Sequence, residues 1–192
     1  MEKTYAKVPK IAIIGGTTAL LRKHDRISIK DLLYGLMLPS GNDAAITLAV
    51  FFGRILINKR KFPTKNYLKI FIKAMNSLVR KYGCFKTTFK NPHGMYYKEN
   101  YSTCEEVSKL GRYFLKIPFL KQMVSVLTYK ASMKSKSDRV REVVYRNTNK
   151  LLKEGFNGLK TGTTWAAGYC LTSTIAKDNV KLLITVLKCK SD

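Results

Sequence analysis

Two short segments, Ser40-Gly41-Asn42 and Lys160-Thr161-Gly162, carry residue types suited to chemistry on a peptide. A hydroxyl and an amide two residues apart on a turn, as in Ser40 and Asn42, can relay a proton and hold a substrate carbonyl. The same pattern is also typical of a turn that caps a following helix, and the bare tripeptide favours that structural interpretation. The longer segment Pro39–Ala45 is more specific and makes Ser40 and Asn42 candidate catalytic residues.

The second segment is suited to the edge of a strand that lines a cleft. The Lys160 ammonium supplies positive charge, and the Thr161 hydroxyl can bind a carboxylate. Because Gly162 has no side chain, a peptide can lie against the strand and pair with its backbone. A β-turn with a surface lysine is the alternative, but it does not account for the continuation from Thr163 to Cys170. We therefore expect Lys160, Thr161 and Gly162 to bind substrate.

Helices are predicted on both sides of the first segment. Ser28 and Asp31 form a capping box ahead of an apolar helical stretch that ends at Pro39. A second helix begins at about Asp43. The signals for three later helices are an apolar stripe over 66–82 stopped by Gly83, a capping box at Ser102 and Glu105, and Pro118 at a first helical position.

The last third of the chain is β-prone. A hairpin is predicted from 124–129 and 140–145, and three further strands from 156–163, 168–176 and 180–187, with Asp178-Asn179 as the last turn. Helices followed by antiparallel strands predict an α+β fold in which a helical cluster packs on an antiparallel sheet. At 192 residues we expect one domain, 1–192.

The chain is strongly basic, with 36 Lys and Arg against 12 Asp and Glu and a net charge of +24. Such a charge attracts polyanions, so an anionic surface such as lipid or an acidic cell wall is a candidate partner. A lysine-rich surface from a biased genome is the alternative. The basic residues are scattered, and only Lys59-Arg60-Lys61 and 130–141 are dense. Since no recognition motif accompanies them, we do not expect specific nucleic-acid binding.

Cysteine and histidine spacing does not predict a metal site. Cys84, Cys104, Cys170 and Cys189 form no C-x-x-C pair, and only two histidines are present, so neither a metal nor another cofactor is expected. We expect free, buried thiols. No apolar run reaches the ~18 residues of a membrane span. The first residues do not have the apolar run of a signal peptide.

Five sequence blocks occur together in one order. They are Leu32–Ala45, Asn91–Met95, Asn100–Thr103, Asn147–Leu152 and Gly158–Gly162. With these blocks the chain resembles the D-alanyl-D-alanine carboxypeptidases, the low-molecular-mass penicillin-binding proteins, which are serine peptidases with a β-lactamase-like fold. The resemblance covers nearly the whole chain.

The resemblance implies acyl transfer on peptidoglycan. A family member removes the terminal D-alanine of a stem peptide through a serine acyl-enzyme, and β-lactams bind the same site. By this resemblance Ser40 and Asn42 shuttle protons and orient the substrate on one wall, while Lys160 and Thr161 bind its terminal carboxylate on the other. The N–H near Thr163 supplies half of an oxyanion hole. Family members are exported proteins.

One family motif is absent: the sequence contains no Ser-x-x-Lys, the motif that carries the nucleophilic serine and the base lysine. We therefore expect the chain to lack the family's N-terminal strands and nucleophile helix and its closing C-terminal helix. We also expect it to be inactive alone, and either prone to aggregation or dependent on a partner. Three hypotheses remain: an incomplete carboxypeptidase, a non-catalytic pseudoenzyme, and a basic binding or scaffold protein.

Overall fold

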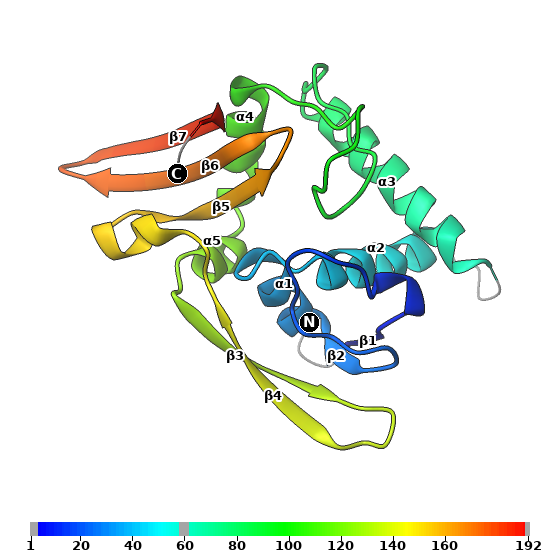
Figure 1. Cartoon of the computed structure of the whole chain (residues 1–192). Helices are drawn as coiled ribbons and strands as arrows, with labels where there is room; N and C mark the ends of the chain where they lie inside the picture. The colour runs from blue at the N-terminus through cyan, green and yellow to red at the C-terminus, as the bar shows by residue number, and fades with distance from the viewer. Residues whose placement is uncertain (1–3, 58–61, 191–192) are drawn as a thin grey trace. The chain divides into compact units, whose positions relative to one another are not determined.

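The chain forms two compact units (Figure 1). The computed structural model describes residues 4–57 and 62–190. The first unit comprises Met1–Met75 and Thr128–Arg146, and the second comprises Asn76–Leu127 and Asn147–Asp192. Helix α3 (Thr64–Lys81) supplies residues to both. The dense basic run Lys59-Arg60-Lys61 lies outside the described residues.

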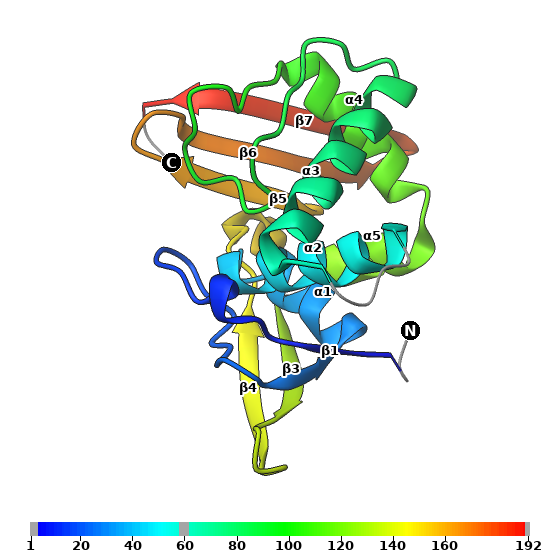
Figure 2. The same cartoon turned by 90° about the vertical axis from the view of Figure 1, so that its right-hand side faces the viewer.

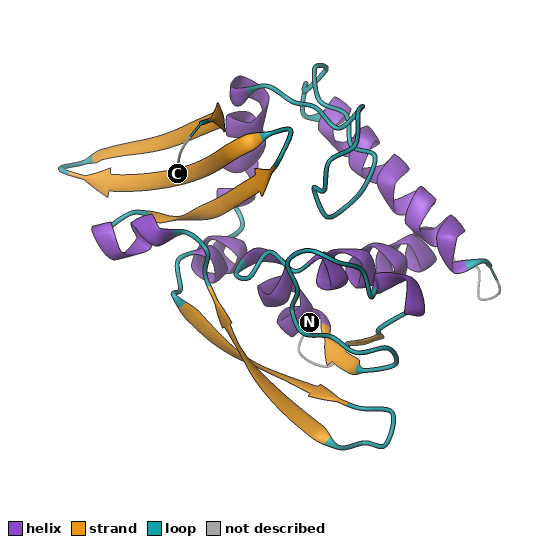
Figure 3. Ribbon diagram, in the orientation of Figure 1, coloured by secondary structure: helices purple, strands orange, loops and turns teal. Residues whose placement is uncertain are grey.

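The first unit contains a four-stranded antiparallel sheet (Figure 3). Its strands are β1 (Tyr5–Lys7), β2 (Arg26–Ser28), β3 (Thr128–Lys134) and β4 (Val140–Arg146), in the order β1-β2-β3-β4. Ala6 pairs with Ile27 and Ile27 with Met133, so one face of the sheet is buried. The short strands β1 and β2 escaped sequence prediction because three residues cannot establish a period-2 pattern.

Helices α1 (Ile29–Met37) and α2 (Asn42–Ile57) complete the core of the first unit. The predicted N-cap of α1 is confirmed, since Ser28 Oγ accepts a hydrogen bond from Asp31 N at 2.9 Å. Helix α1 packs on β2 and β3, and α2 packs on α1, on β1 and on the short 3₁₀ turn η1 (Lys10–Ala12). The fully buried apolar residues of this core include Val8, Ala12, Ile27, Leu32, Leu38, Ala44, Ala49 and Met133.

The second unit is built on a three-stranded antiparallel sheet. Its strands are β5 (Asn157–Thr164), β6 (Gly168–Lys177) and β7 (Val180–Cys189), in the order β5-β6-β7. Helix α4 (Cys104–Leu115) packs on β7 and β6, and α5 (Pro118–Val124) packs on β5 (Figure 2). The three predicted strands are confirmed. Asp178 and Asn179 both have positive φ, which confirms the predicted tight turn.

Two local predictions are wrong. The expected strand over 124–129 is divided, because α5 extends to Val124 and buries Met123 and Val124, and β3 begins only at Thr128. The capping box at Ser102 is also displaced. Thr103 caps α4 by accepting from Glu106 N, while the Ser102 hydroxyl bonds to that of Thr87.

The predicted α+β class is confirmed, with the antiparallel strands divided between two sheets rather than joined in one. The single-domain expectation stays a prediction. All four cysteines are free thiols, but only Cys84 is buried, and Cys104 is exposed. Among the described helices, none combines the length and the apolar character needed to cross a membrane.

Candidate functional site

The Ser40-Gly41-Asn42 turn joins α1 to α2 in a constrained backbone. Ser40 has φ +60, a left-handed conformation that is uncommon for residues other than glycine. A side chain at Gly41 would place its Cβ 2.7 Å from Ala19 N and 2.8 Å from Gly35 O. Glycine is therefore required at position 41 by close packing, and the tripeptide is held by more than a simple helix cap.

Asn42 is buried and bound to a loop from the start of the chain. Its Nδ2 donates to Gly15 O at 2.9 Å, and its backbone N donates to Thr17 O at 2.9 Å. The Thr17 hydroxyl donates to the Ser40 carbonyl. These bonds fasten the Ser-Gly-Asn turn to residues that lie more than twenty positions earlier in the chain.

Asp43 anchors the same loop and was treated in the sequence only as the start of a helix. Its buried carboxylate accepts from Thr18 Oγ1 at 2.6 Å and from the backbone N of Ala19 at 2.8 Å and Leu21 at 3.0 Å. It also accepts from Ala44 N at 2.8 Å. A carboxylate with four donors is stable without a counter-ion. An acidic residue directly after Ser-Gly-Asn was the available signal.

Lys160, Thr161, Gly162 and Thr163 lie on β5, which is an edge strand of the second sheet. Lys160 pairs with Thr172 and Gly162 pairs with Cys170 on β6, so these side-chain positions share one face. Thr161 and Thr163 belong to the opposite face. Because no strand within residues 4–57 and 62–190 pairs with the other side of β5, its backbone groups there are available to an extended peptide.

Among the lysines and arginines of the described residues, Lys160 has the pKa that departs most from its ordinary value. Its ammonium donates to Thr161 O at 2.6 Å and the side chain is half-buried. Burial lowers the pKa of Lys160 to about 8. Thr161 Oγ1 lies 2.6 Å from Thr148 Oγ1, so its hydroxyl is oriented by a residue of the loop that precedes η2 (Lys150–Glu154).

Asn149 positions the start of β5. Its buried amide donates to Gly158 O at 2.9 Å and to Ser173 Oγ at 3.3 Å, and its Oδ1 accepts from Leu151 N. Asn147 continues this anchoring with two bonds from its Nδ2 to Val124 O and Val126 O. The Asn-Thr-Asn block therefore supports the Lys-Thr-Gly strand, a role that its sequence did not reveal.

The Asn91-Pro92-His93-Gly94 block forms a closed loop in the second unit. Asn91 Oδ1 accepts from Gly94 N at 2.8 Å, and Asn91 Nδ2 donates to Met95 O at 2.9 Å. Burial lowers the pKa of His93. The two hydrogen bonds of the Asn91 side chain are internal to the loop.

The structure thus brings the predicted residues into two groups, one in each unit. Ser40 lies beside Asn42 and Asp43 in the first unit, and Lys160 lies beside Thr161, Gly162 and Thr163 in the second. Within the described residues, no three His, Cys, Asp or Glu side chains gather as metal ligands would.

Known proteins are similar to this chain in sequence. DacF of Bacillus subtilis (strain 168), a D-alanyl-D-alanine carboxypeptidase, is 29% identical over 177 residues, which are 91% of this chain and 41% of DacF. The D-alanyl-D-alanine carboxypeptidase of Streptomyces sp. (strain K15) is 32% identical over 166 residues, covering 85% of this chain and 55% of that protein. The chain therefore spans about half the length of these relatives.

The fold has an experimental counterpart. The crystal structure of the Streptomyces K15 DD-transpeptidase matches with a TM-score of 0.91 at 28% identity, covering 100% of this chain and 74% of that one. The family model for D-alanyl-D-alanine carboxypeptidases matches residues 7–191. Because this match covers nearly every residue, including the Ser-Gly-Asn and Lys-Thr-Gly segments, this chain belongs to the D-alanyl-D-alanine carboxypeptidase family.

Proposed function

We propose that this chain supplies binding walls of a serine-type D-Ala-D-Ala carboxypeptidase. Its ligand is a peptide that ends in D-Ala-D-Ala, as in peptidoglycan, or a β-lactam. In the proposal Lys160 and Thr161 bind the terminal carboxylate. Ser40 and Asn42 shuttle protons and orient the scissile amide.

The observation that carries the proposal is the state of Lys160. A half-buried ammonium with a pKa of about 8 is incompletely solvated, so a carboxylate gains more from pairing with it than with an exposed lysine. It lies on the edge strand β5 beside Gly162, where an extended peptide can pair with the backbone. In the proposal the N–H of Thr163 on the same strand contributes to an oxyanion hole.

The nucleophile is not among these 192 residues in the family's form. Acylation needs the hydroxyl of a Ser-x-x-Lys serine to attack the amide carbonyl, with its proton passing to the lysine. No such motif occurs in the sequence. We therefore propose that the chain as it stands binds the peptide and does not cleave it.

The experiment separates binding from acylation. The chain is incubated with a fluorescent penicillin and analysed by denaturing electrophoresis, and the expected result is no covalent label. Reversible binding of N-acetyl-D-Ala-D-Ala is followed by NMR chemical-shift changes. The peptide amide, which lacks the terminal carboxylate, serves as the matched control. A covalent label would overturn the inactivity, and equal binding of acid and amide would overturn the role of Lys160.

A non-catalytic binding protein of the same fold is the second candidate. It is favoured by the combination of retained Ser-Gly-Asn and Lys-Thr-Gly segments with no Ser-x-x-Lys in the sequence. If residues supplied separately that carry a Ser-x-x-Lys helix restore penicillin labelling, the carboxypeptidase reading stands. Persistent peptide binding with no labelling under that condition supports the binding protein.

A further inference from the structure

Three cationic residues lie directly opposite one another in the sheet of the first unit. Lys7 on β1 pairs with Arg26 on β2, and Arg26 pairs with Lys134 on β3. Directly paired residues project from the same face, so these three exposed side chains form one row, which we call the basic row. Like charges in opposite positions destabilise a sheet, and a bound anion would relieve that repulsion.

Carboxylates near the basic row are already engaged elsewhere. Asp25 pairs with Arg141 at 2.7 Å and accepts from Arg22 N at 2.9 Å. Glu142 pairs with Lys130 at 2.7 Å. Across residues 4–57 and 62–190, neither of these ion pairs includes a member of the basic row. Its charge is therefore open to an external anion.

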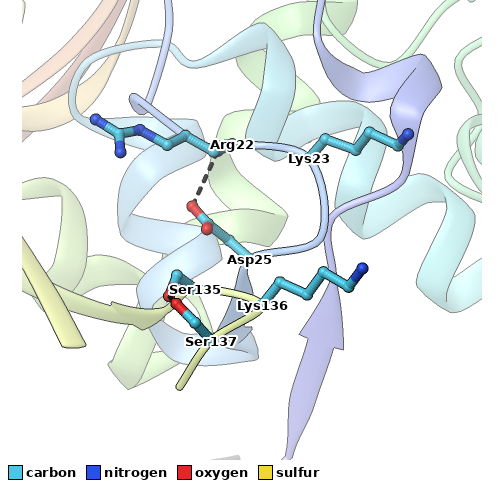
Figure 4. Close-up of a pocket in the computed structure, with 6 residues that line it drawn as sticks. All are labelled: Arg22, Lys23, Asp25, Ser135, Lys136 and Ser137. Atoms are coloured by element: carbon cyan, nitrogen blue, oxygen red, sulfur yellow. Dashed lines mark hydrogen bonds between the residues drawn. The ribbon is translucent and has the colours of Figure 1, made fainter. Parts of the chain in front are cut away.

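A shallow pocket of about 440 Å³ is lined by residues that directly precede Arg26 and directly follow Lys134 in the chain (Figure 4). Its lining residues are Arg22, Lys23, Asp25, Ser135, Lys136 and Ser137. In Figure 4 the side chains of Lys23 and Lys136 extend in the same direction, and Arg22 extends to the other side. The hydroxyls of Ser135 and Ser137, which also line the pocket, lie 3.0 Å apart. Ammonium and hydroxyl donors of this kind suit a phosphate oxyanion.

The basic row and the pocket contribute to one positive field. His24 lies between Lys23 and Asp25 in the chain, and desolvation lowers its pKa. The charges of Lys23, Lys7 and Lys136 lower it further. Because Lys7 belongs to the row and the other two belong to the pocket, all three act on the same neighbour.

Apolar side chains share the face of the basic row. Val140 pairs with Lys134 and is 60% exposed. Val144 and Tyr5 lie on the same face by the alternation of β4 and β1 and are also more than half exposed. Cations interleaved with exposed apolar groups are suited to a lipid interface, where phosphates meet acyl chains. A free phosphate or a nucleic-acid backbone would leave the apolar groups without a partner.

We propose that this face of the first unit binds an anionic lipid surface through its phosphate headgroups. The basic row and the pocket lysines contact the phosphates, and Val140, Val144 and Tyr5 lie at the headgroup boundary. The surface is made by residues other than Ser40, Asn42 and the Lys160 strand, so its test is independent of acyl transfer.

Vesicle co-sedimentation tests the proposal on the full chain. Binding is compared between pure phosphatidylcholine vesicles and vesicles that contain a quarter phosphatidylglycerol, with inorganic phosphate and soluble polyphosphate as competitors. The row variant carries Lys7→Gln, Arg26→Gln and Lys134→Gln. The matched control carries Lys153→Gln, Lys177→Gln and Lys181→Gln, three exposed lysines of the second unit, so both variants have the same net charge. Thermal unfolding verifies that each is folded.

The expected result is binding to the anionic vesicles alone. At about fivefold per charge near an anionic membrane, the row variant loses on the order of 100-fold in partitioning, and the control loses much less. Equal losses of vesicle partitioning in the two variants would show that binding depends on the total charge and not on the basic row, and would overturn the proposal. So would absence of vesicle binding, or tight binding of polyphosphate without binding to vesicles. Should the row variant fail to fold, Lys23→Gln with Lys136→Gln in the pocket replaces it, and Lys153→Gln with Lys177→Gln becomes its control of equal net charge.

Discussion

The hydroxyl oxygens of Thr148 and Thr161 lie 2.6 Å apart, which joins the loop before η2 to the Lys-Thr-Gly strand. Thr148 is exposed and Thr161 is half-buried, so the bond is formed at the surface of the second unit. In the proposed site the Thr161 hydroxyl donates to a carboxylate. The hydrogen bond with Thr148 therefore sets the direction of the Thr161 hydroxyl proton before the ligand binds.

Replacing Thr148 tests this orientation. Thr148→Val is expected to weaken binding of N-acetyl-D-Ala-D-Ala by roughly fivefold, because a neutral hydrogen bond contributes about 1 kcal/mol. Thr148→Ser keeps the hydroxyl and is expected to bind as the original chain does. NMR titration measures both. Equal affinity of the Val and Ser variants would contradict an orienting role, and thermal unfolding should show little change for either.

The affinity for the carboxylate is expected to fall as pH rises through about 8. Burial lowers the pKa of Lys160 to about 8 from an ordinary 10.5, so the side chain is charged below pH 8 and neutral above it. Lys160→Arg keeps its charge throughout this range and should remove the pH dependence. Titrations of the acid peptide between pH 6 and 10 measure the effect, with the peptide amide as control. A flat profile for the original chain would contradict the assignment.

The same lowered pKa predicts a trend in stability. Between about pH 8 and 10.5 the unfolded chain holds a proton on Lys160 that the folded chain has lost, so this residue's contribution to stability rises with pH. Below pH 8 both states are protonated and the penalty of burying the charge is fully present. Lys160→Met removes that penalty. Urea unfolding should show the variant's advantage at pH 7 shrinking at pH 10, and a growing advantage would contradict the burial effect.

Asp43→Asn is expected to destabilise the chain by about 3 kcal/mol. The buried carboxylate accepts from four donors, and an amide offers one acceptor oxygen and points new N–H groups at the others. Thr18→Val removes one donor and should cost about 1 kcal/mol. Urea denaturation at neutral pH measures both free energies of unfolding. Similar costs for the two variants would contradict the role of Asp43 as the common anchor.

Tyr145→Phe is expected to stabilise the first unit. The Tyr145 hydroxyl is buried and has no hydrogen-bond partner among the described residues, and burial raises its pKa well above the usual range. Deleting the oxygen removes an uncompensated desolvation cost of about 1 kcal/mol. Differential scanning calorimetry should show a higher Tm. A lower Tm would mean that the hydroxyl has a partner such as an ordered water.

Local signals predicted the elements well where their partners are close in the chain. Ser28 caps α1 through Asp31 three residues later, and the Asp178-Asn179 turn joins adjacent strands. The failure at Ser102 has a distant cause. Thr87 holds the Ser102 hydroxyl and also donates to the Glu106 carboxylate, so the local capping pattern is replaced by a contact across the loop.

The candidate site residues could be proposed from the sequence, but the residues that hold them in place could not. Ser40, Asn42 and Lys160 are polar residues in recognisable segments. Asp43 gains its role from donors at Thr18, Ala19 and Leu21, which no short-range pattern connects to it. Asn149 likewise acts on a strand that follows a separate turn. Such partners are set by tertiary packing, which periodicity does not encode.

The sheet of the first unit has a consequence for how the chain folds during synthesis. Strand β2 ends at Ser28, but its neighbour β3 begins only at Thr128, after the segment Asn76–Leu127 of the second unit has been made. One edge of β2 therefore has no strand to pair with while the ribosome translates the intervening segment. Closure of this sheet depends on contacts that are far apart in the chain, which makes it slow. A chaperone would therefore be needed most during the period of synthesis before β3 has been made, while the first unit is incomplete.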